Sequence, residues 1–397
     1  MNAEHIKNAA GELLSETVET RRFLHAHPEV SWHEIETSKY VEAHLRELGL
    51  TNIKRGFGGT EAGVTADLDC GDGPRVALRS DMDALPVREE NDVPYRSQND
   101  GAMHACGHDG HISILLGAAR ILKSMAPSLR GSIRFIFQPA EENGDPSGAR
   151  KMIEDGAIEG VDAIGGLHLW SFVETGKVQW RQGPVMASSD RLNVTIRGKG
   201  GHGAMPHMAV DPIVAAANYV SAIQTITSRE LDPLDSAVVS IGKISSGDTF
   251  NIIPERVAIL GSLRSFRDEV RTSQEERLRR IGDGIASAYR CTAETRVSYM
   301  LPSVVNDPKI TEILRDAAVE IAGPGLTEES PPLMVSEDFG VYLEHIPGTF
   351  FFVGAGNPAK GADFPHHSPR FNIDEDALAT GISMMTAFGV SALEKLR

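Results

Sequence analysis

Eight of the fourteen histidines lie in a few short stretches of the chain: His104, His108, His111, His168, His202, His207, His366 and His367. The stretch from His104 to His111 combines imidazoles with the thiol of Cys106 and the carboxylate of Asp109, directly before a helix predicted over 111–125. Side chains of these types bind transition metals, and the N–H groups at a helix start favour a thiolate. A polar helix cap with one satisfied histidine is the alternative, and it leaves most of the cluster unexplained.

The elements that must position these residues alternate between strand and helix. Short β-rich runs at 75–79, 132–137, 163–167 and 349–353 predict buried strands of a mostly parallel sheet with helices on both faces. Polar residues follow each run: Asp81 and Asp83, Glu141 and Glu142, His168, and His366 with His367. Because sites in such sheets form beyond the carboxyl ends of the strands, we expect these residues to converge on one metal centre.

The adjacent carboxylates Glu141 and Glu142 point to different sides of a turn. One can hold a metal while its neighbour faces a water molecule and acts as general base. A solvated pair of glutamates on a loop is the alternative. The position of the pair at a strand end, beside other candidate ligands, favours the catalytic interpretation.

Around residue 188 the pattern changes. Strands are predicted over 191–197, 236–244 and 257–265, with helices over 212–227 and 269–288, and these strands look half-exposed. We therefore predict an inserted α+β domain at 188–301. Residues 1–187 and 302–397 would form a discontinuous α/β catalytic domain around the mostly parallel sheet.

Composition excludes several classes of function. The chain has 397 residues, 41% of them hydrophobic, and a formal net charge of −16, which disfavours nucleic acid as a partner. No run of about 18 apolar residues predicts a membrane span, and the first residues lack the profile of a signal peptide. Three cysteines, Cys70, Cys106 and Cys291, are typical of a reducing compartment, so we expect a cytoplasmic protein.

Five motifs follow one another along the chain: Arg79-Ser-Asp81-Met-Asp83-Ala-Leu-Pro86, His104-Ala-Cys106-Gly-His108-Asp109, Gln138-Pro-Ala-Glu141-Glu142, Gly166-Leu-His168 and His367-Ser-Pro369. Together they resemble the metallo-aminoacylase and carboxypeptidase family. The resemblance runs nearly end to end. It is closest to the branch of hippurate hydrolase, N-acyl-amino-acid amidohydrolases and plant indole-3-acetyl-amino acid hydrolases.

The resemblance implies a centre of two divalent metal ions bridged by Cys106. Glu142 and His367 would complete one metal, and His108 and His168 the other. Glu141 would be the catalytic base. Many relatives have His-x-Asp where this chain has Asp81-Met-Asp83, and an aspartate in place of Cys106. We therefore expect His108 to replace the missing ligand and Asp83, with Asp81, to orient the ligands. Sulfur, nitrogen and oxygen donors suit zinc or manganese, and also cobalt or nickel.

The inserted domain resembles the family's lid and dimerisation domain. Its signature, Gly198-Lys-Gly-Gly201-His202-Gly-Ala-Met-Pro206-His207, implies a homodimer in which His202 stabilises the oxyanion at the partner's site. Asn251 and Arg264 match substrate-binding positions, and a guanidinium is well shaped to hold a carboxylate. From the residues alone, the glycines could form a tight turn and Arg264 could be an exposed strand residue.

The resemblance implies a metal-dependent amidohydrolase that cleaves the amide of an N-acyl amino acid into a carboxylic acid and a free amino acid. A metallo-carboxypeptidase or dipeptidase of the same fold is the alternative. A cysteine hydrolase with Cys106 as nucleophile and His108 or His104 as base is a further one, but it leaves the glutamates and distant histidines without a role. A binding module without turnover is disfavoured because the predicted base and ligands are all present.

Overall fold

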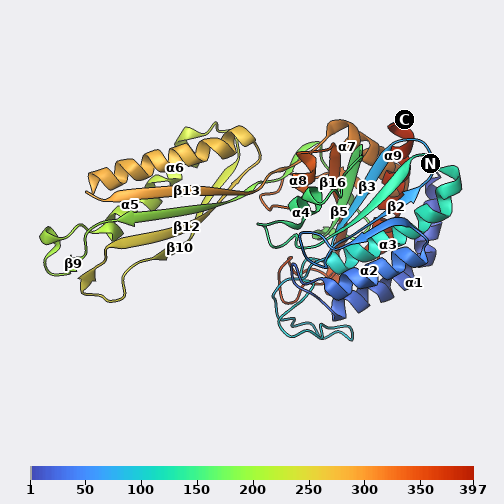
Figure 1. Cartoon of the computed structure of the whole chain (residues 1–397), viewed down its shortest axis with the longest axis horizontal. Coiled ribbons are helices and arrows are strands. Elements are labelled where there is room, and N and C mark those ends of the chain that lie inside the picture. The colour runs from blue at the N-terminus through green and yellow to red at the C-terminus, as the bar shows by residue number, and fades with distance from the viewer. Residues whose placement is uncertain (1) are drawn as a thin grey trace. The chain divides into compact units, whose positions relative to one another are not determined.

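The computed structural model describes residues 2–397, which form two compact units (Figure 1). Unit 1 comprises residues up to Val185 together with Val305–Pro331 and Asp338–Arg397. Unit 2 comprises Met186–Val304 and Pro332–Glu337. The short segment 332–337 joins unit 2 through hydrogen bonds from the Ala187 N–H to the carbonyls of Leu333 and Val335. No spacing in the sequence indicated this second crossing of the chain.

Unit 1 is built on an eight-stranded sheet in the order β1-β2-β4-β3-β5-β16-β6-β15. The central neighbours β4, β3, β5 and β16 are parallel to one another, whereas β1 and β2 extend the sheet antiparallel at one side. The prediction of a mostly parallel α/β sheet is confirmed. The bounds are Thr51–Arg55 (β1), Val64–Asp69 (β2), Arg75–Asp81 (β3), Ser132–Gln138 (β4), Ala163–Glu174 (β5), Val178–Trp180 (β6), Thr327–Glu329 (β15) and Gly348–Gly356 (β16).

Helices cover both faces of this sheet. Adjacent residues of a strand point to opposite faces, and Gly165 of β5 faces Phe388 of α9 whereas Gly166 faces Phe339 of α8. Helices α1, α3 and α7 pack with α9, and α4 packs with α8. The bounds are Ala3–Ala26 (α1), Ile35–Glu47 (α2), His108–Met125 (α3), Gly148–Glu154 (α4), Pro308–Ala322 (α7), Phe339–Leu343 (α8) and Ala377–Lys395 (α9).

Helix α9 is long and apolar enough to cross a membrane by length and composition. In the structure 83% of its apolar window is buried within the protein. It contacts β3, β5 and β16, so its apolar surface forms part of the core of unit 1.

Unit 2 contains a four-stranded antiparallel sheet, β10-β12-β8-β13, whose core includes residues of helices α5 and α6. The edge strand β13 was not predicted from the sequence, because its alternating residues are mostly exposed or only half-buried. The helix predicted over 212–227 ends at Ala222. The bounds are Ser189–Arg197 (β8), Gly201–His202 (β9), Pro212–Ala222 (α5), Ala237–Ser245 (β10), Ile252–Ile253 (β11), Arg256–Ser265 (β12), Asp268–Ala288 (α6) and Thr292–Leu301 (β13). The short strands Gly183–Met186 (β7) and Val304–Asn306 (β14) pair with each other.

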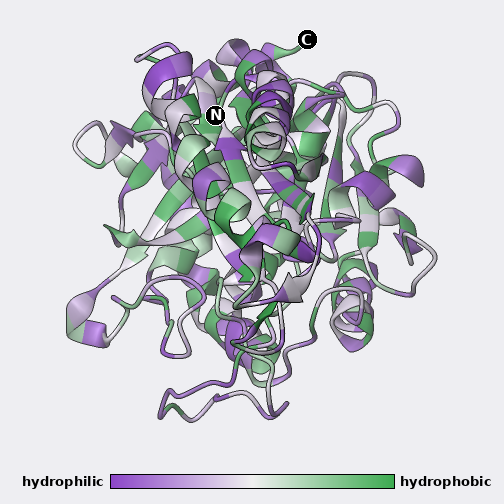
Figure 2. Cartoon of the chain, turned by 90° about the vertical axis from the view of Figure 1, so that its left-hand side faces the viewer, coloured by the Kyte–Doolittle hydropathy of each residue, from purple (hydrophilic) through white to green (hydrophobic). Residues whose placement is uncertain are grey.

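Hydropathy colouring shows hydrophobic and hydrophilic residues interspersed along the helices and strands (Figure 2). On β8 buried positions alternate with less buried ones, as expected for a strand with one face on a core. The buried residues Leu192, Val194 and Ile196 belong to the core of unit 2.

Candidate metal centre

Two groups of potential ligands in unit 1 share the sulfur of Cys106. The ligand atoms of Cys106, His108 and His168 all lie within 4.8 Å of one another, and so do those of Cys106, Glu142 and His367. Cys106 Sγ lies 3.4 Å from His168 Nε2, and His367 Nε2 lies 3.2 Å from Glu142 Oε1. The structure therefore brings together all five residues expected to bind metal, in the two sets expected for a bridged pair of ions.

The local backbone conformation positions two of these ligands, Cys106 and His367. Gly107 has φ of 90°, a left-handed conformation that suits glycine, and the chain turns there from Cys106 into α3. His367 also has a left-handed φ, 66°, and its N–H donates to the carbonyl of Ala105 at 2.8 Å. This hydrogen bond holds the histidine loop against the segment that carries Cys106.

Two of the histidines have a fixed tautomer. His108 Nδ1 donates to the carbonyl of Asp83 at 2.8 Å, and His168 Nδ1 donates to the carbonyl of Leu169 at 2.7 Å. Because a carbonyl oxygen can only accept, each Nδ1 carries the proton. Nε2 is then the nitrogen of each ring that is left for a metal, which is the arrangement that oriented histidine ligands adopt.

Two ligand atoms at the centre are buried without any hydrogen-bond partner among the described residues: His108 Nε2 and Glu142 Oε1. Buried polar atoms are normally satisfied, so two convergent exceptions indicate a missing partner. A divalent cation would satisfy both, and the mixed sulfur, nitrogen and oxygen donors fit a transition metal. The residues present therefore fit the metal centre that the sequence predicts.

The charges around the centre also favour a cation. Burial, together with Glu142 and Glu141, raises the pKa of the Cys106 thiol well above its usual range. Although burial disfavours a charged imidazole, Asp81 and Asp83 raise the pKa of His108 to about 10. Without metal this pocket therefore retains protons, and a divalent ion would supply the positive charge in their place.

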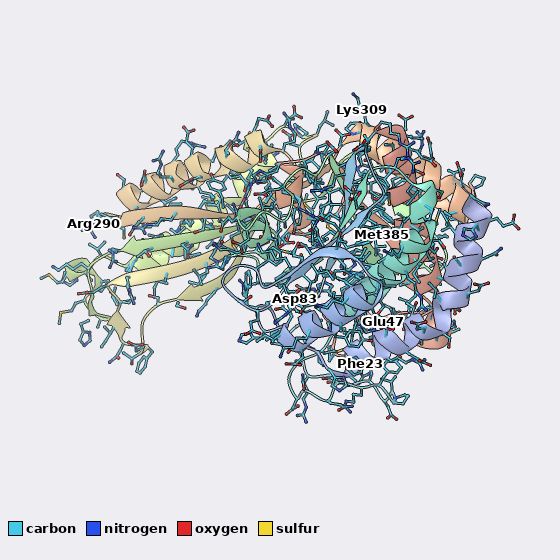
Figure 3. All side chains as sticks on the ribbon, turned by 45° about the vertical axis from the view of Figure 1, so that its right-hand side comes forward. Phe23, Glu47, Asp83, Arg290, Lys309 and Met385 are labelled. Carbon is cyan, nitrogen blue, oxygen red and sulfur yellow. The ribbon has the colours of Figure 1, made fainter. Side chains whose placement is uncertain are left out.

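Asp83, which is labelled in Figure 3, accepts hydrogen bonds from the turn that carries the two glutamates. Its Oδ1 accepts from the N–H of Glu141 at 3.1 Å and its Oδ2 from the N–H of Glu142 at 3.0 Å. It lies 3.3 Å from His108 Nδ1 as well. One buried carboxylate thus positions two glutamates and one histidine, which is what the sequence analysis expected of an orienting group.

Asp81 orients a different part of the centre. Its Oδ1 accepts from His111 Nδ1 at 2.7 Å, and its Oδ2 accepts from Arg79 at 2.9 Å. His111 Nε2 accepts in turn from the N–H of Leu169 at 2.9 Å, so both of its nitrogens are used. His111 is therefore a support for β5 beside His168 and not a third ligand.

His168 lies within β5 and not at the end of a strand, so this part of the sequence-based prediction was wrong. Strand β3 pairs with β5 only as far as Arg79 and Gly166, whereas β16 continues to pair beyond His168, through Leu169 and Trp170. Strand β5 thus loses one of its two neighbouring strands just before His168. The carboxyl end of β3 still leaves room for a site there, even though β5 itself runs on.

His366 belongs to the predicted histidine cluster but to neither ligand group. Its ring stacks on Trp170 with centroids 4.6 Å apart, and its Nε2 accepts from the N–H of Ser171 at 3.3 Å. Its Nδ1 lies 3.9 Å from Cys106 Sγ. The two adjacent residues are both histidines, so the sequence alone does not show that His366 stacks on Trp170 whereas His367 joins a ligand group.

A buried network that sequence reasoning did not assign lies next to the centre. Asp338 accepts from Arg79 Nη2 at 2.9 Å and from Gln138 Nε2 at 2.8 Å, and its N–H donates to Glu141 Oε1 at 3.4 Å. The only signal in the sequence was the motif Ser336-Glu-Asp338-Phe339, whose chemistry the residues alone do not reveal. This network ties the ends of β3 and β4 to the side chain of Glu141.

In unit 2 the pairing of β9 with β11 places His202 opposite Ile252, next to Asn251. His202 is exposed, and its Nδ1 accepts from the N–H of Ala204 at 3.0 Å, which leaves Nε2 as a hydrogen-bond donor. Arg264 lies at the other end of β12 from β11, about 26 Å along an extended strand. One copy of unit 2 therefore does not bring Arg264 together with His202 and Asn251.

Arg264 is half-buried and has no ion pair among the described residues. Its Nη1 is buried without a hydrogen-bond partner, and burial lowers the pKa of its guanidinium. A buried guanidinium with an unused donor is a suitable site for an anion.

Comparison with known proteins agrees with this geometry. The family model described as Peptidase family M20/M25/M40 matches residues 77–389. The chain belongs to this family. N-acetyl-L-cysteine deacetylase of Bacillus subtilis is 43% identical to this M20 chain over 366 residues, which cover 90% of this chain and 83% of the relative.

Other relatives of this M20 protein carry different names. Thermostable carboxypeptidase 1 of Saccharolobus solfataricus is 40% identical and covers 95% of both chains. An IAA-amino acid hydrolase of Arabidopsis thaliana is 39% identical and covers 95% of this chain and 86% of the relative. The family and these relatives show that the chain is a metal-dependent hydrolase.

Two solved structures have the same fold as this chain. A putative aminohydrolase from Staphylococcus aureus superposes with a TM-score of 0.90, at 36% identity and with both chains covered completely. A protein from Bacillus subtilis described as a dinuclear metal-binding peptidase of the M20 family has a TM-score of 0.84 at 35% identity, with 97% of this chain and 99% of that chain covered. These findings, with the two ligand groups, support two divalent metal ions in this M20 chain.

Proposed function

We propose that the chain hydrolyses the amide bond of N-acyl amino acids and releases a carboxylic acid and a free amino acid. The observation that carries this proposal is the pair of ligand groups sharing Cys106, with Glu141 beside them. A carboxylate oxygen of Glu141 lies within 4.8 Å of ligand atoms of His108 and Glu142, yet Glu141 belongs to neither of the two groups that share Cys106. It is therefore placed to exchange a proton at the centre.

Two divalent ions, zinc or manganese by the donor set and cobalt or nickel as alternatives, would polarise the scissile carbonyl and lower the pKa of water at this centre. Glu141 removes a proton from the attacking water and then delivers it to the departing amine. Asp83 keeps Glu141 and Glu142 in place during both proton transfers. The Nε2–H of His202 is suited to donate to the oxyanion of the tetrahedral intermediate.

The separation of the unit 2 residues supports a homodimer. Because Arg264 lies at the far end of β12 from His202 and Asn251, one substrate molecule cannot reach all three in a single copy of unit 2. A second copy would supply His202 and Asn251 where the first supplies Arg264. We propose that residues 188–301 form this lid and dimerisation domain. We also propose a cytoplasmic location, supported by three cysteines without disulfides.

Arg264→Ala is expected to raise KM by about 10- to 100-fold, because hydrogen bonds to a charged group contribute about 1.5–3 kcal/mol. We assign Arg264 to the α-carboxylate of the substrate. Steady-state kinetics on an N-acyl amino acid and on its α-amide would measure this. The α-amide should have the higher KM with the wild-type protein, and the two KM values should become similar with the variant. Arg191→Ala, which removes an exposed arginine of β8, is the matched control. Equal losses for both substrates would contradict the assignment.

The carboxypeptidase alternative is favoured by the relative named Thermostable carboxypeptidase 1. A cysteine hydrolase is disfavoured by the geometry. The pKa of Cys106 is raised, chiefly by burial, and the pKa of His168, whose Nε2 lies 3.4 Å away, is lowered well below its usual range by burial. The histidine contacts of Cys106 Sγ are with His168 and His366, and not with His108 or His104, the bases that this alternative requires.

Hydrolysis of a panel of N-acyl amino acids and peptides tests the proposal. On β5 the residues His168, Trp170 and Phe172 share one face, and Phe172 is 65% exposed. This aromatic row beside Cys106 supports apolar acyl groups, so benzoylglycine should have a lower KM than acetylglycine. Both should require metal. Cleavage of peptides at the C-terminus without hydrolysis of any N-acyl amino acid would establish the carboxypeptidase alternative.

A further inference from the structure

The segment between α1 and α2 lies against the metal centre although it precedes the part of the chain that matches the family model, 77–389. Val30 forms a parallel bridge with Ala84, and the Ala84 N–H donates to the Glu29 carbonyl at 2.8 Å. This backbone contact fixes the segment beside Asp83, at the end of β3. Two of its polar side chains, Ser31 and Glu34, are then within reach of the residues that carry the chemistry.

The turn after β4 is held by three consecutive N–H groups. The N–H of Ala140 donates to Glu34 Oε1 at 2.7 Å, and the next two, of Glu141 and Glu142, donate to the two oxygens of Asp83. Ala140 has φ of 53°, in the left-handed region that a residue with a Cβ seldom adopts. The turn therefore needs these bonds to keep its conformation.

Glu34 is fully buried and forms no ion pair with any described residue, and its Oε2 has no hydrogen-bond partner. A buried carboxyl group in this condition costs stability, so packing alone does not explain it. Ser31 completes the arrangement, since its hydroxyl donates to Asp83 Oδ2 at 2.6 Å. Both side chains of the segment therefore reach Glu141 through one intermediate: Glu34 through Ala140, and Ser31 through Asp83.

We infer that Glu34 and Ser31 are positioning residues that hold the turn 140–142 so that the carboxylate of Glu141 faces the metal centre. The inference rests on the proposed function in one respect, the role of Glu141 as the base. Neither residue belongs to the two ligand groups that share Cys106. In variants of either residue the N–H of Glu142 can keep its bond to Asp83, so we expect metal to be retained and the effect to fall on the placement of the base.

Glu34→Ala tests the inference. The variant is expected to lower kcat by about 100-fold, since a misplacement of about 1 Å in a reacting group costs on that order. KM should stay within about twofold and both metal ions should remain bound, as measured by steady-state kinetics and elemental analysis. Glu34→Gln keeps an oxygen that can accept from Ala140, and the raised pKa of the buried Glu34 makes a neutral side chain a close match. It should restore kcat to within about threefold of wild type.

Glu29→Ala is the matched control. Glu29 belongs to the same segment and its side chain also accepts from two backbone N–H groups, but these are Glu36 and Thr37 at the start of α2. This variant should lower Tm without changing kcat. Unchanged kcat in folded, metal-loaded Glu34→Ala would overturn the inference, and so would a loss of kcat in Glu29→Ala as large as that in Glu34→Ala.

Ser31→Ala decides the matter if Glu34→Ala does not fold. It removes one hydroxyl, and kcat should fall by about 3- to 10-fold with metal content unchanged. Unchanged kcat in Ser31→Ala would then overturn the inference. A different result would contradict the proposed role of Glu141 as the base: full activity of Glu141→Gln. An inactive Glu141→Gln beside fully active Glu34→Ala and Ser31→Ala would overturn the positioning role alone.

Discussion

Glu141→Gln is expected to lower kcat by about 10²- to 10⁴-fold, the range that general acid and base catalysis contributes. Glutamine keeps the size of the side chain and an oxygen for the N–H of Asp338, but it cannot accept and return a proton. The N–H of residue 141 would still bind Asp83, so the turn should not move. KM and metal content should be close to wild type, measured by steady-state kinetics and elemental analysis of the same preparation.

Glu142→Gln is the matched control because the two glutamates share the turn and the contact with Asp83. Glu142 Oε1 lies 3.2 Å from His367 Nε2, and both belong to one ligand group with Cys106, so its substitution should remove metal as well as activity. Two results would contradict these assignments. If Glu141→Gln loses metal, Glu141 is a ligand, and if it keeps full activity with full metal content, the base lies elsewhere.

The convergence of the candidate ligands could be predicted from the sequence because parallel strands bring their carboxyl ends to one edge of a sheet. Asp81 and Gln138 are the last residues of β3 and β4, so the segments that carry Asp83 and the glutamates had to be neighbours. Cys106 was indicated by its place among the histidines of 104–111, directly before a helix with a strong apolar pattern. That helix was predicted from residue 111 and begins at His108. The family resemblance then divided the ligands between two metals.

The supporting residues could not be predicted, because their roles depend on atoms that meet only in three dimensions. His111 has the same type and nearly the same spacing as a ligand, and only its contacts with Asp81 and Leu169 show that both nitrogens are used. Glu34 lies more than a hundred residues before Ala140 in the chain. Strand β5 is also longer than the strand predicted over 163–167, because its pairing with β16 continues after β3 has ended.

Removal of metal is expected to abolish hydrolysis, and restoration of two divalent ions per chain should recover it. Without metal, His108 Nε2 is buried without a hydrogen-bond partner among residues 2–397, and the raised pKa values of Cys106 and His108 favour their protonated forms. The residues alone are therefore not arranged for catalysis. Since a ligand thiol must lose its proton, metal uptake should release protons and become tighter as pH rises. Activity after dialysis against a chelator, followed by titration with zinc, manganese or cobalt at two pH values, measures both effects.

Cys106→Asp and Cys106→Ala separate the metal mechanism from a cysteine nucleophile. Aspartate offers another anionic donor at the position shared by both ligand groups, so Cys106→Asp should keep metal and part of the activity. Alanine offers no donor and should lose both. If Cys106 were a nucleophile, both variants would be inactive and the chelated wild-type protein would remain active. A chelated protein that retains its activity would therefore exclude the shared metal centre, and a chelated protein without activity would exclude Cys106 as a metal-independent nucleophile.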